Sequence, residues 1–179
     1  SAVLEKIIQA SSLKGSDLVI EVGPGKGILT EQLATHVGKV VTIELDDALI
    51  PELTKKFEAQ KNVEIIHEDI LKINLPELIK HYSLLTTHYK LIANIPYYIT
   101  SPIIRLFLEQ DQQPQEIILM VQKEVAERIV EKPGRASILS VSVQYYAAAE
   151  ILFPVSKNSF SPAPKVDSAV IKIIPNKKF

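Results

Sequence analysis

Apolar runs that read as strands alternate with helix-like segments along almost the whole sequence, and this alternation limits the fold more than any other feature. Parallel neighbouring strands need a crossover connection, usually a helix, so the alternation predicts an α/β fold with a largely parallel sheet. We expect seven strands, at residues 17–22, 39–44, 63–67, 89–94, 115–121, 149–153 and 168–174. We expect helices, on both faces of the sheet, at residues 2–11, 27–37, 47–59, 76–82, 101–110, 122–131 and 136–147.

The start of one helix has a clear signal. Ser101 is a suitable N-cap and Pro102 would take the first helical position, where a missing N–H costs nothing. The turn at residues 132–134, Lys-Pro-Gly, is expected to separate two later helices.

Length and composition indicate one soluble globular domain. The chain has 179 residues, 46% of them hydrophobic and 23% charged. It has no cysteine, which excludes disulfides, thiolate zinc sites and a cysteine nucleophile, and its four histidines lack metal-ligand spacing, so no metal site is expected. We see no membrane span and no signal peptide, and expect a cytoplasmic protein, or in a eukaryote one of an organelle matrix or the nucleolus.

Charge is unevenly distributed, although the formal net charge is only −1. Residues 120–179 hold nine Lys/Arg against five Asp/Glu, and residues 1–119 hold eleven against sixteen. The basic final third is compatible with a polyanionic partner, but solvated charges are also usual on any surface. Candidates for phosphate contacts are Lys123, Arg128, Lys132, Arg135, Lys157 and Lys165.

A glycine-rich turn follows the first expected strand and opens a helix. The segment 21–27 reads Glu-Val-Gly-Pro-Gly-Lys-Gly, with G-x-G-x-G spacing. A dinucleotide fingerprint would have its third glycine at Ile28, and an ATP-binding P-loop would need a Lys-Ser/Thr pair. The spacing therefore favours S-adenosylmethionine (SAM) over NAD or ATP.

Two acidic residues lie at the ends of the next two strands. Glu44 comes 21 positions after Gly23, where a carboxylate can accept hydrogen bonds from both ribose hydroxyls, and Asp69 is placed to accept one from the adenine amino group of a nucleotide. A helix cap or a solvated loop acid is the alternative for each, and it is our interpretation of Asp46 and Asp47.

The fourth strand ends in Asn94-Ile95-Pro96-Tyr97, which suits the amino group of a flat base. The Asn94 side-chain oxygen and the Ile95 carbonyl can both accept hydrogen bonds from an exocyclic NH2, and Tyr97 can stack on the ring. Two such acceptors would localise the lone pair of adenine N6 for attack without a strong base. A strand that ends in a turn, with Pro96 setting the turn, is the simpler alternative.

Several segments together resemble the rRNA adenine N6,N6-dimethyltransferases, the KsgA-like enzymes. The resemblance rests on residues 21–30 (Glu-Val-Gly-Pro-Gly-Lys-Gly-Ile-Leu-Thr), 44–46 (Glu-Leu-Asp), 68–71 (Glu-Asp-Ile-Leu), 94–97, 120–128 (Met-Val-Gln-Lys-Glu-Val-Ala-Glu-Arg) and 160–168 (Phe-Ser-Pro-Ala-Pro-Lys-Val-Asp-Ser). It covers nearly the whole chain. It implies one Rossmann-like class I SAM-dependent methyltransferase domain over residues 1–179.

The resemblance also implies roles for individual residues. The SAM site would be lined by Gly23, Gly25, Glu44, Asp69 and Asn94, with backbone help from Leu45 and Ile70. The target adenine would be held by Asn94, Ile95, Pro96 and Tyr97, with Phe160 completing an aromatic pocket. An ordinary buried aromatic is the alternative for Phe160, and Met120 is expected in the core.

The function so implied is SAM-dependent dimethylation of adenine N6 in small-subunit rRNA, coupled to ribosome biogenesis and carried out by a monomer. Segments 120–128 and 166–168 resemble the small-subunit enzymes more than the antibiotic-resistance enzymes that modify large-subunit RNA. Two alternatives are an RNA-binding assembly or transcription factor that keeps the fold, and an NAD-dependent oxidoreductase. The sequence lacks the Gln-Asn-Phe-Leu-type segment and the helical C-terminal domain usual in the family, which puts the activity and RNA recognition of this chain in doubt.

Overall fold

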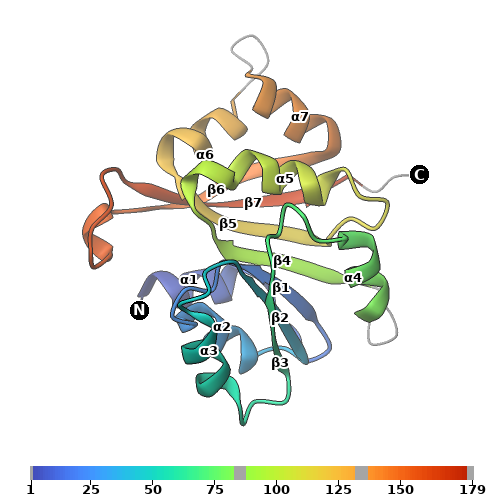
Figure 1. Ribbon diagram of the computed structural model, residues 1–179. Coiled ribbons are helices and arrows are strands. Elements are labelled where there is room, and N and C mark those ends of the chain that lie inside the picture. The colour runs from blue at the N-terminus through green and yellow to red at the C-terminus, as the bar shows by residue number, and fades with distance from the viewer. Residues whose placement is uncertain (1, 83–87, 132–136, 177–179) are drawn as a thin grey trace.

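The computed structural model describes residues 2–82, 88–131 and 137–176. Its centre is one seven-stranded sheet with the strand order β3-β2-β1-β4-β5-β7-β6 (Figure 1). The strands are β1 (Leu18–Val22), β2 (Lys39–Glu44), β3 (Val63–His67), β4 (Tyr89–Asn94), β5 (Glu116–Gln122), β6 (Ala147–Val155) and β7 (Ser168–Pro175). The first five are mutually parallel, and β7 runs antiparallel to both β5 and β6. The predicted seven-stranded, mostly parallel sheet is confirmed.

Successive side chains of a strand point to opposite faces of the sheet, and this divides the core into two layers. Leu18, Ile20 and Val22 belong to one buried cluster, whereas Val19 between them belongs to the other. In β5 the same alternation separates Leu119 from Met120, which is buried as expected. Both faces of the sheet are therefore apolar and both need a cover of helices.

Helices supply that cover, as predicted. They are α1 (Ala2–Ala10), α2 (Ile28–Ala34), α3 (Ile50–Phe57), α4 (Leu75–Tyr82), α5 (Thr100–Leu108), α6 (Lys123–Ile129) and α7 (Ile138–Tyr146), with short 3₁₀ turns η1 (Tyr97–Ile99) and η2 (Lys157–Ser159). Residues of α4, α5, α6 and α7 pack in one cluster, and residues of α1 and α2 pack in the other. Figure 1 shows α5, α6 and α7 grouped beside β5, β6 and β7.

Several boundaries differ by one or more residues from the sequence-based expectation, and two of the differences have a clear physical reason. Ser101 is not an N-cap, because η1 leads directly into α5, which begins at Thr100 after an N-cap at Ile99 that makes no side-chain cap hydrogen bond. Pro102 still lies in the first turn, where its missing N–H is tolerated. Strand β6 begins at Ala147 rather than at residue 149, because pairing with β7 overrides the helix propensity of its alanines. The expected turn at 132–134 lies outside the described residues.

A buried charge network holds α1 at the amino-terminal edge of the sheet. Lys90, only 6% exposed, lies with its Nζ 3.1 Å from Asp17 Oδ2 and 3.2 Å from Glu116 Oε1. The same ammonium donates to the carbonyls of Ser11 and Ser12, just after α1, at 2.9 and 3.0 Å. This edge is opposite to the one where the polar motifs gather.

Candidate cofactor and base site

The glycine turn between β1 and α2 requires its glycines. Gly23, Gly25 and Gly27 all have positive φ angles, of 66°, 57° and 70°. At Gly27 a Cβ would also lie 2.6 Å from Cε2 of Phe57, so α3 packs directly on the turn. At Gly23 a Cβ would be 3.7 Å from Cδ of Pro96, so the turn runs beside the segment that follows β4. The tertiary fold therefore brings together two motifs that lie 73 positions apart in the sequence.

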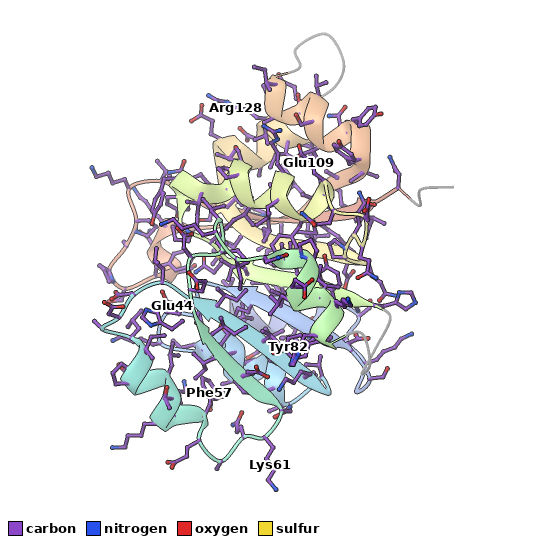
Figure 2. The ribbon with its side chains drawn as sticks, turned by 45° about the vertical axis from the view of Figure 1, so that its right-hand side comes forward. Glu44, Phe57, Lys61, Tyr82, Glu109 and Arg128 are labelled. Carbon is purple, nitrogen blue, oxygen red and sulfur yellow. The ribbon has the colours of Figure 1, made fainter. Side chains whose placement is uncertain are left out.

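Glu44 is fixed at the end of β2 by three backbone donors. Its Oε1 accepts from the N–H groups of Leu45 and Asp46 at 2.8 and 2.9 Å, and its Oε2 accepts from the N–H of Gly25 at 3.3 Å. A carboxylate has about four acceptor positions, so capacity remains for ligand hydroxyls. Figure 2 shows Glu44 at the carboxyl end of β2. Lys61, in the loop before β3, lies near the opposite ends of the strands.

Asp69 lies beyond β3, and its carboxylate already makes two contacts within the protein. Its Oδ1 accepts from the N–H of Leu71 at 3.0 Å, and its Oδ2 lies 3.6 Å from Lys72 Nζ. This is the loop-stabilising role considered as the alternative for this residue, and it leaves room for a ligand contact as well. Asp46 Oδ1 accepts from the N–H of Ala48 at 2.9 Å, in keeping with a structural role for that residue.

A cavity of about 460 Å³ opens at this edge of the sheet. Six of the predicted site residues line it, namely Gly23, Glu44, Leu45, Asp69, Ile70 and Pro96. Seven further residues line the cavity without having been predicted as site residues, namely Val22, Ile43, Asp46, Glu68, Leu71, Tyr98 and Ile99. Most of these are immediate neighbours of predicted residues, so proximity in the sequence was the available signal. The lining combines apolar side chains with carboxylates, a combination that suits a nucleoside.

The remaining predicted residues lie around the cavity rather than on its wall. Gly25 does not line the cavity, but its N–H donates to the carboxylate of Glu44, which does. Asn94 is the exposed last residue of β4. Ile95 is buried. Tyr97 and Tyr98 diverge: Tyr98 is 81% exposed on the cavity rim, whereas the Tyr97 hydroxyl is hydrogen-bonded to Ser168 Oγ at 3.1 Å.

Phe160 follows η2 in the connection from β6 to β7. It is half-buried and packs against the cluster that contains Val155 and Val170. The peptide bond between Ser161 and Pro162 in the same connection is cis. Phe160 is not among the residues that line the cavity, so its role in a base pocket remains a prediction.

Glu21 lies behind the glycine turn as a buried acid. Its Oε2 accepts a 2.6 Å hydrogen bond from Thr30 Oγ1. Burial raises the pKa of Glu21 to about 7, and the negative charge of Glu44 adds to the increase, although the hydrogen bond from Thr30 opposes it. A carboxyl group that gains and loses its proton near neutral pH therefore lies next to the site.

Two of the candidate phosphate-contacting residues form ion pairs within the protein. Lys123 Nζ lies 4.0 Å from Glu127 Oε1, and Arg128 pairs with Glu124, all on α6. Lys157 and Lys165 are exposed in the connection from β6 to β7. Lys132 and Arg135 lie outside the described residues. An RNA-binding role for this group remains a prediction.

The strand order and the cavity at the carboxyl edge define the class of protein: a domain with the Rossmann-like fold of the SAM-dependent methyltransferases. The particular family follows from comparison with known proteins. The family model described as "Ribosomal RNA adenine dimethylase" matches residues 1–179, and the chain belongs to this family.

Curated relatives agree with that assignment. "Ribosomal RNA small subunit methyltransferase A" of Dehalococcoides mccartyi (strain CBDB1) is 47% identical over 172 residues, which are 96% of this chain and 58% of the relative. The protein of the same name from Ligilactobacillus salivarius is 46% identical over 178 residues, 98% of this chain and 60% of the relative. The chain thus spans about three fifths of the length of these relatives.

Two solved structures have a closely similar fold. A dimethyladenosine transferase from Plasmodium falciparum matches with a TM-score of 0.85 and 35% identity, over 98% of this chain and 62% of that one. The 23S rRNA methyltransferase ErmE matches with a TM-score of 0.85 and 28% identity, over 99% of this chain and 68% of that one. Among the residues that the structure describes, no helix is long and apolar enough to cross a membrane.

Proposed function

We propose that this protein transfers methyl groups from SAM to N6 of adenine in small-subunit rRNA, twice at each target base. The observation that carries the proposal is that Gly23, Glu44, Asp69 and Pro96 line one and the same cavity. The first three belong to the predicted cofactor motifs, and Pro96 belongs to the predicted base motif. A cofactor held there would lie beside a base held by residues 94–97, which is the proximity that group transfer requires.

The residues present fit SAM. Glu44 would accept from the ribose hydroxyls, and its three backbone donors hold it ready to do so. Asp69 would accept from the adenine amino group, while Ile43 and Ile70 supply apolar walls of the cavity. Gly23 lets the backbone approach the ligand closely. When bound, SAM would supply a methyl group on a cationic sulfur.

The proposed base-binding residues would make the amino group of the target adenine more reactive toward the methyl group. Asn94 Oδ1 and the Ile95 carbonyl would accept hydrogen bonds from the amino group of an adenine drawn out of its stack, and the rings of Tyr97 and Phe160 would hold the base. The two acceptors localise the nitrogen lone pair. The nitrogen loses its proton only after it has gained the methyl group, so the chain needs no strong base at this position.

The test is methyl transfer from labelled SAM to unmodified small-subunit rRNA, with nucleoside analysis of the product. We expect N6,N6-dimethyladenosine from the unaltered protein and at least a hundredfold lower rate from Asn94→Ala, in line with the loss of a preorganised polar contact. Ser140→Ala, a buried change in α7 away from the cavity, is the control. Unchanged methylation by Asn94→Ala would show that the assigned role of Asn94 is wrong.

Large-subunit RNA is the second candidate substrate, because ErmE shares the fold at 28% identity. The higher identity to relatives named as small-subunit methyltransferases favours small-subunit RNA. Presenting both RNAs in one competition assay distinguishes the two substrates. The proposed partner is the small-subunit rRNA or its precursor particle, met by a monomer in the cytoplasm. Binding of RNA and SAM without methyl transfer would instead support the non-catalytic assembly factor.

A further inference from the structure

Two consecutive tyrosines after β4 face different parts of the molecule. Tyr98 lines the cavity, where the proposed cofactor would bind. Tyr97 is half-buried and does not belong to that lining, and its hydroxyl lies 3.1 Å from Oγ of Ser168 on β7. The Tyr97 ring is therefore attached at both ends: to the backbone of η1 and, through its hydroxyl, to another strand of the sheet.

Ser168 is a rigid anchor for this contact. It is 1% exposed and begins the strand that lies between β5 and β6, with Gln122 and Val155 as its register partners. The preceding residue, Asp167, is also held on two sides. Its carbonyl accepts from the N–H of Lys123 at 3.0 Å, and its carboxylate accepts from the N–H of Lys157 at 2.9 Å. The backbone that carries the Ser168 side chain is consequently held in place.

From this geometry we propose that Ser168 is a positioning residue, which holds the Tyr97 ring at the angle needed to stack on the target adenine. The inference rests on the proposed function, because it gives Tyr97 the base-stacking role. A tyrosine ring with a free hydroxyl samples several orientations, whereas a hydrogen bond to a fixed partner keeps one of them. Small errors in the placement of a reacting group lower the rate of transfer.

The contact acts on the base and leaves cofactor binding alone, because neither Tyr97 nor Ser168 lines the cavity. Losing the hydrogen bond should lower kcat for methyl transfer by about three- to tenfold while the Kd for SAM stays unchanged. The second transfer requires the monomethylated base to be seated again. We therefore expect the ratio of monomethyl- to dimethyladenosine to rise. Compared at equal total conversion of the RNA, that ratio does not depend on the fraction of active protein, so simple destabilisation would not move it.

The experiment compares Ser168→Ala, Tyr97→Phe and the double variant on unmodified small-subunit rRNA. Each change removes the same hydrogen bond, so the two single variants and the double variant should lose the same factor in kcat and give the same raised product ratio. Tyr97→Phe leaves the buried strand unaltered, which keeps the test valid if Ser168→Ala reduces the folded fraction. Ser140→Ala is the matched control, because Ser140 is equally buried and donates a 2.9 Å bond to the Ser137 carbonyl.

The possible outcomes separate this inference from the proposed function. No methylation of adenine N6 by the unaltered protein would overturn the proposed function, and the inference with it. Methylation by the unaltered protein, with a wild-type rate and product ratio in Tyr97→Phe, would overturn the inference alone. Losses in the two single variants that multiply in the double variant would also overturn it, because the two hydroxyls would then act independently.

Discussion

The backbone N–H of Gly25 donates to Oε2 of Glu44 at 3.3 Å, so the glycine turn after β1 and the carboxylate that ends β2 form one unit. The contact links neighbouring parallel strands at their carboxyl ends, where ligands bind in open α/β sheets. It also means that a change at Glu44 affects both the proposed ribose acceptor and the turn beside it.

We predict that Glu44→Ala weakens SAM binding by roughly 10- to 100-fold, since charge-assisted hydrogen bonds contribute about 1.5–3 kcal/mol. Calorimetric titration with SAM and S-adenosylhomocysteine measures the effect, with NAD as a ligand expected not to bind. Asp47→Ala is the control, because the Asp47 side chain is 89% exposed and does not line the cavity. Equal affinity in Glu44→Ala and the unaltered protein would remove Glu44 from the cofactor site.

Gly27→Ala should destabilise the protein more than Gly25→Ala. Both glycines have positive φ, which costs a residue with a side chain about 1–2 kcal/mol. A Cβ at position 25 meets nothing within 4 Å, whereas one at position 27 would lie 2.6 Å from the Phe57 ring. The clash adds about 1–3 kcal/mol of overpacking. Urea unfolding of the two variants gives the comparison, and equal midpoints would contradict the assigned packing of α3 on the turn.

The strands were predictable because their burial is regular. The ranges expected for β2, β3 and β4 match the observed bounds, since each is a short apolar run closed by polar residues. The edge of the sheet that carries the cavity was predictable for a related reason, as Glu44 and Asp69 lie at the carboxyl ends of consecutive parallel strands, which share one edge. Hydrophobic periodicity and topology were sufficient for these features.

Other features depend on tertiary contacts that the sequence does not display. A proline suits any position of a first helical turn, so Pro102 could not reveal that η1 joins directly to α5. The placement of β7 between β5 and β6 comes from a long-range antiparallel pairing. The divergence of Tyr97 and Tyr98 depends on side-chain directions in a 3₁₀ turn, which explains why Tyr98 was not assigned to the cavity.

Glu21 should make stability fall as the pH rises. Burial raises its pKa from 4.5 to about 7, so the folded protein holds the proton more tightly than the unfolded chain. The resulting stabilisation is fully present below pH 4.5 and is lost as the pH rises through about 7, a change of about 3 kcal/mol.

Glu21→Gln should flatten this part of the stability profile, because an amide carries no charge at any pH. Urea unfolding at intervals from pH 4.5 to 8 measures the profile, and Glu31→Gln on the exposed side of α2 serves as the control. A profile for Glu21→Gln that falls as steeply as that of the unaltered protein would assign the pH dependence to other groups.

Lys90 should be essential for stability and unimportant for cofactor binding. Replacement by Met leaves Asp17 without its buried partner and removes one of the two lysines near Glu116, the other being Lys172 at 3.0 Å. Breaking a buried ion pair on one side costs about 3–5 kcal/mol, because the remaining charge stays desolvated. The carbonyls of Ser11 and Ser12 lose a donor at the same time, which loosens the end of α1.

Lys72→Met is the matched control for this prediction. Lys72 is 78% exposed and lies 3.6 Å from Asp69, so its pair contributes no more than about 1 kcal/mol. Urea unfolding should show a large shift of the midpoint for Lys90→Met and a small one for Lys72→Met. Titration with SAM under native conditions should give an unchanged Kd for the folded fraction of Lys90→Met, because the network and the cavity lie at opposite edges of the sheet. A weakened Kd would mean that the buried charges at the amino-terminal edge influence the cofactor site through the strands between them.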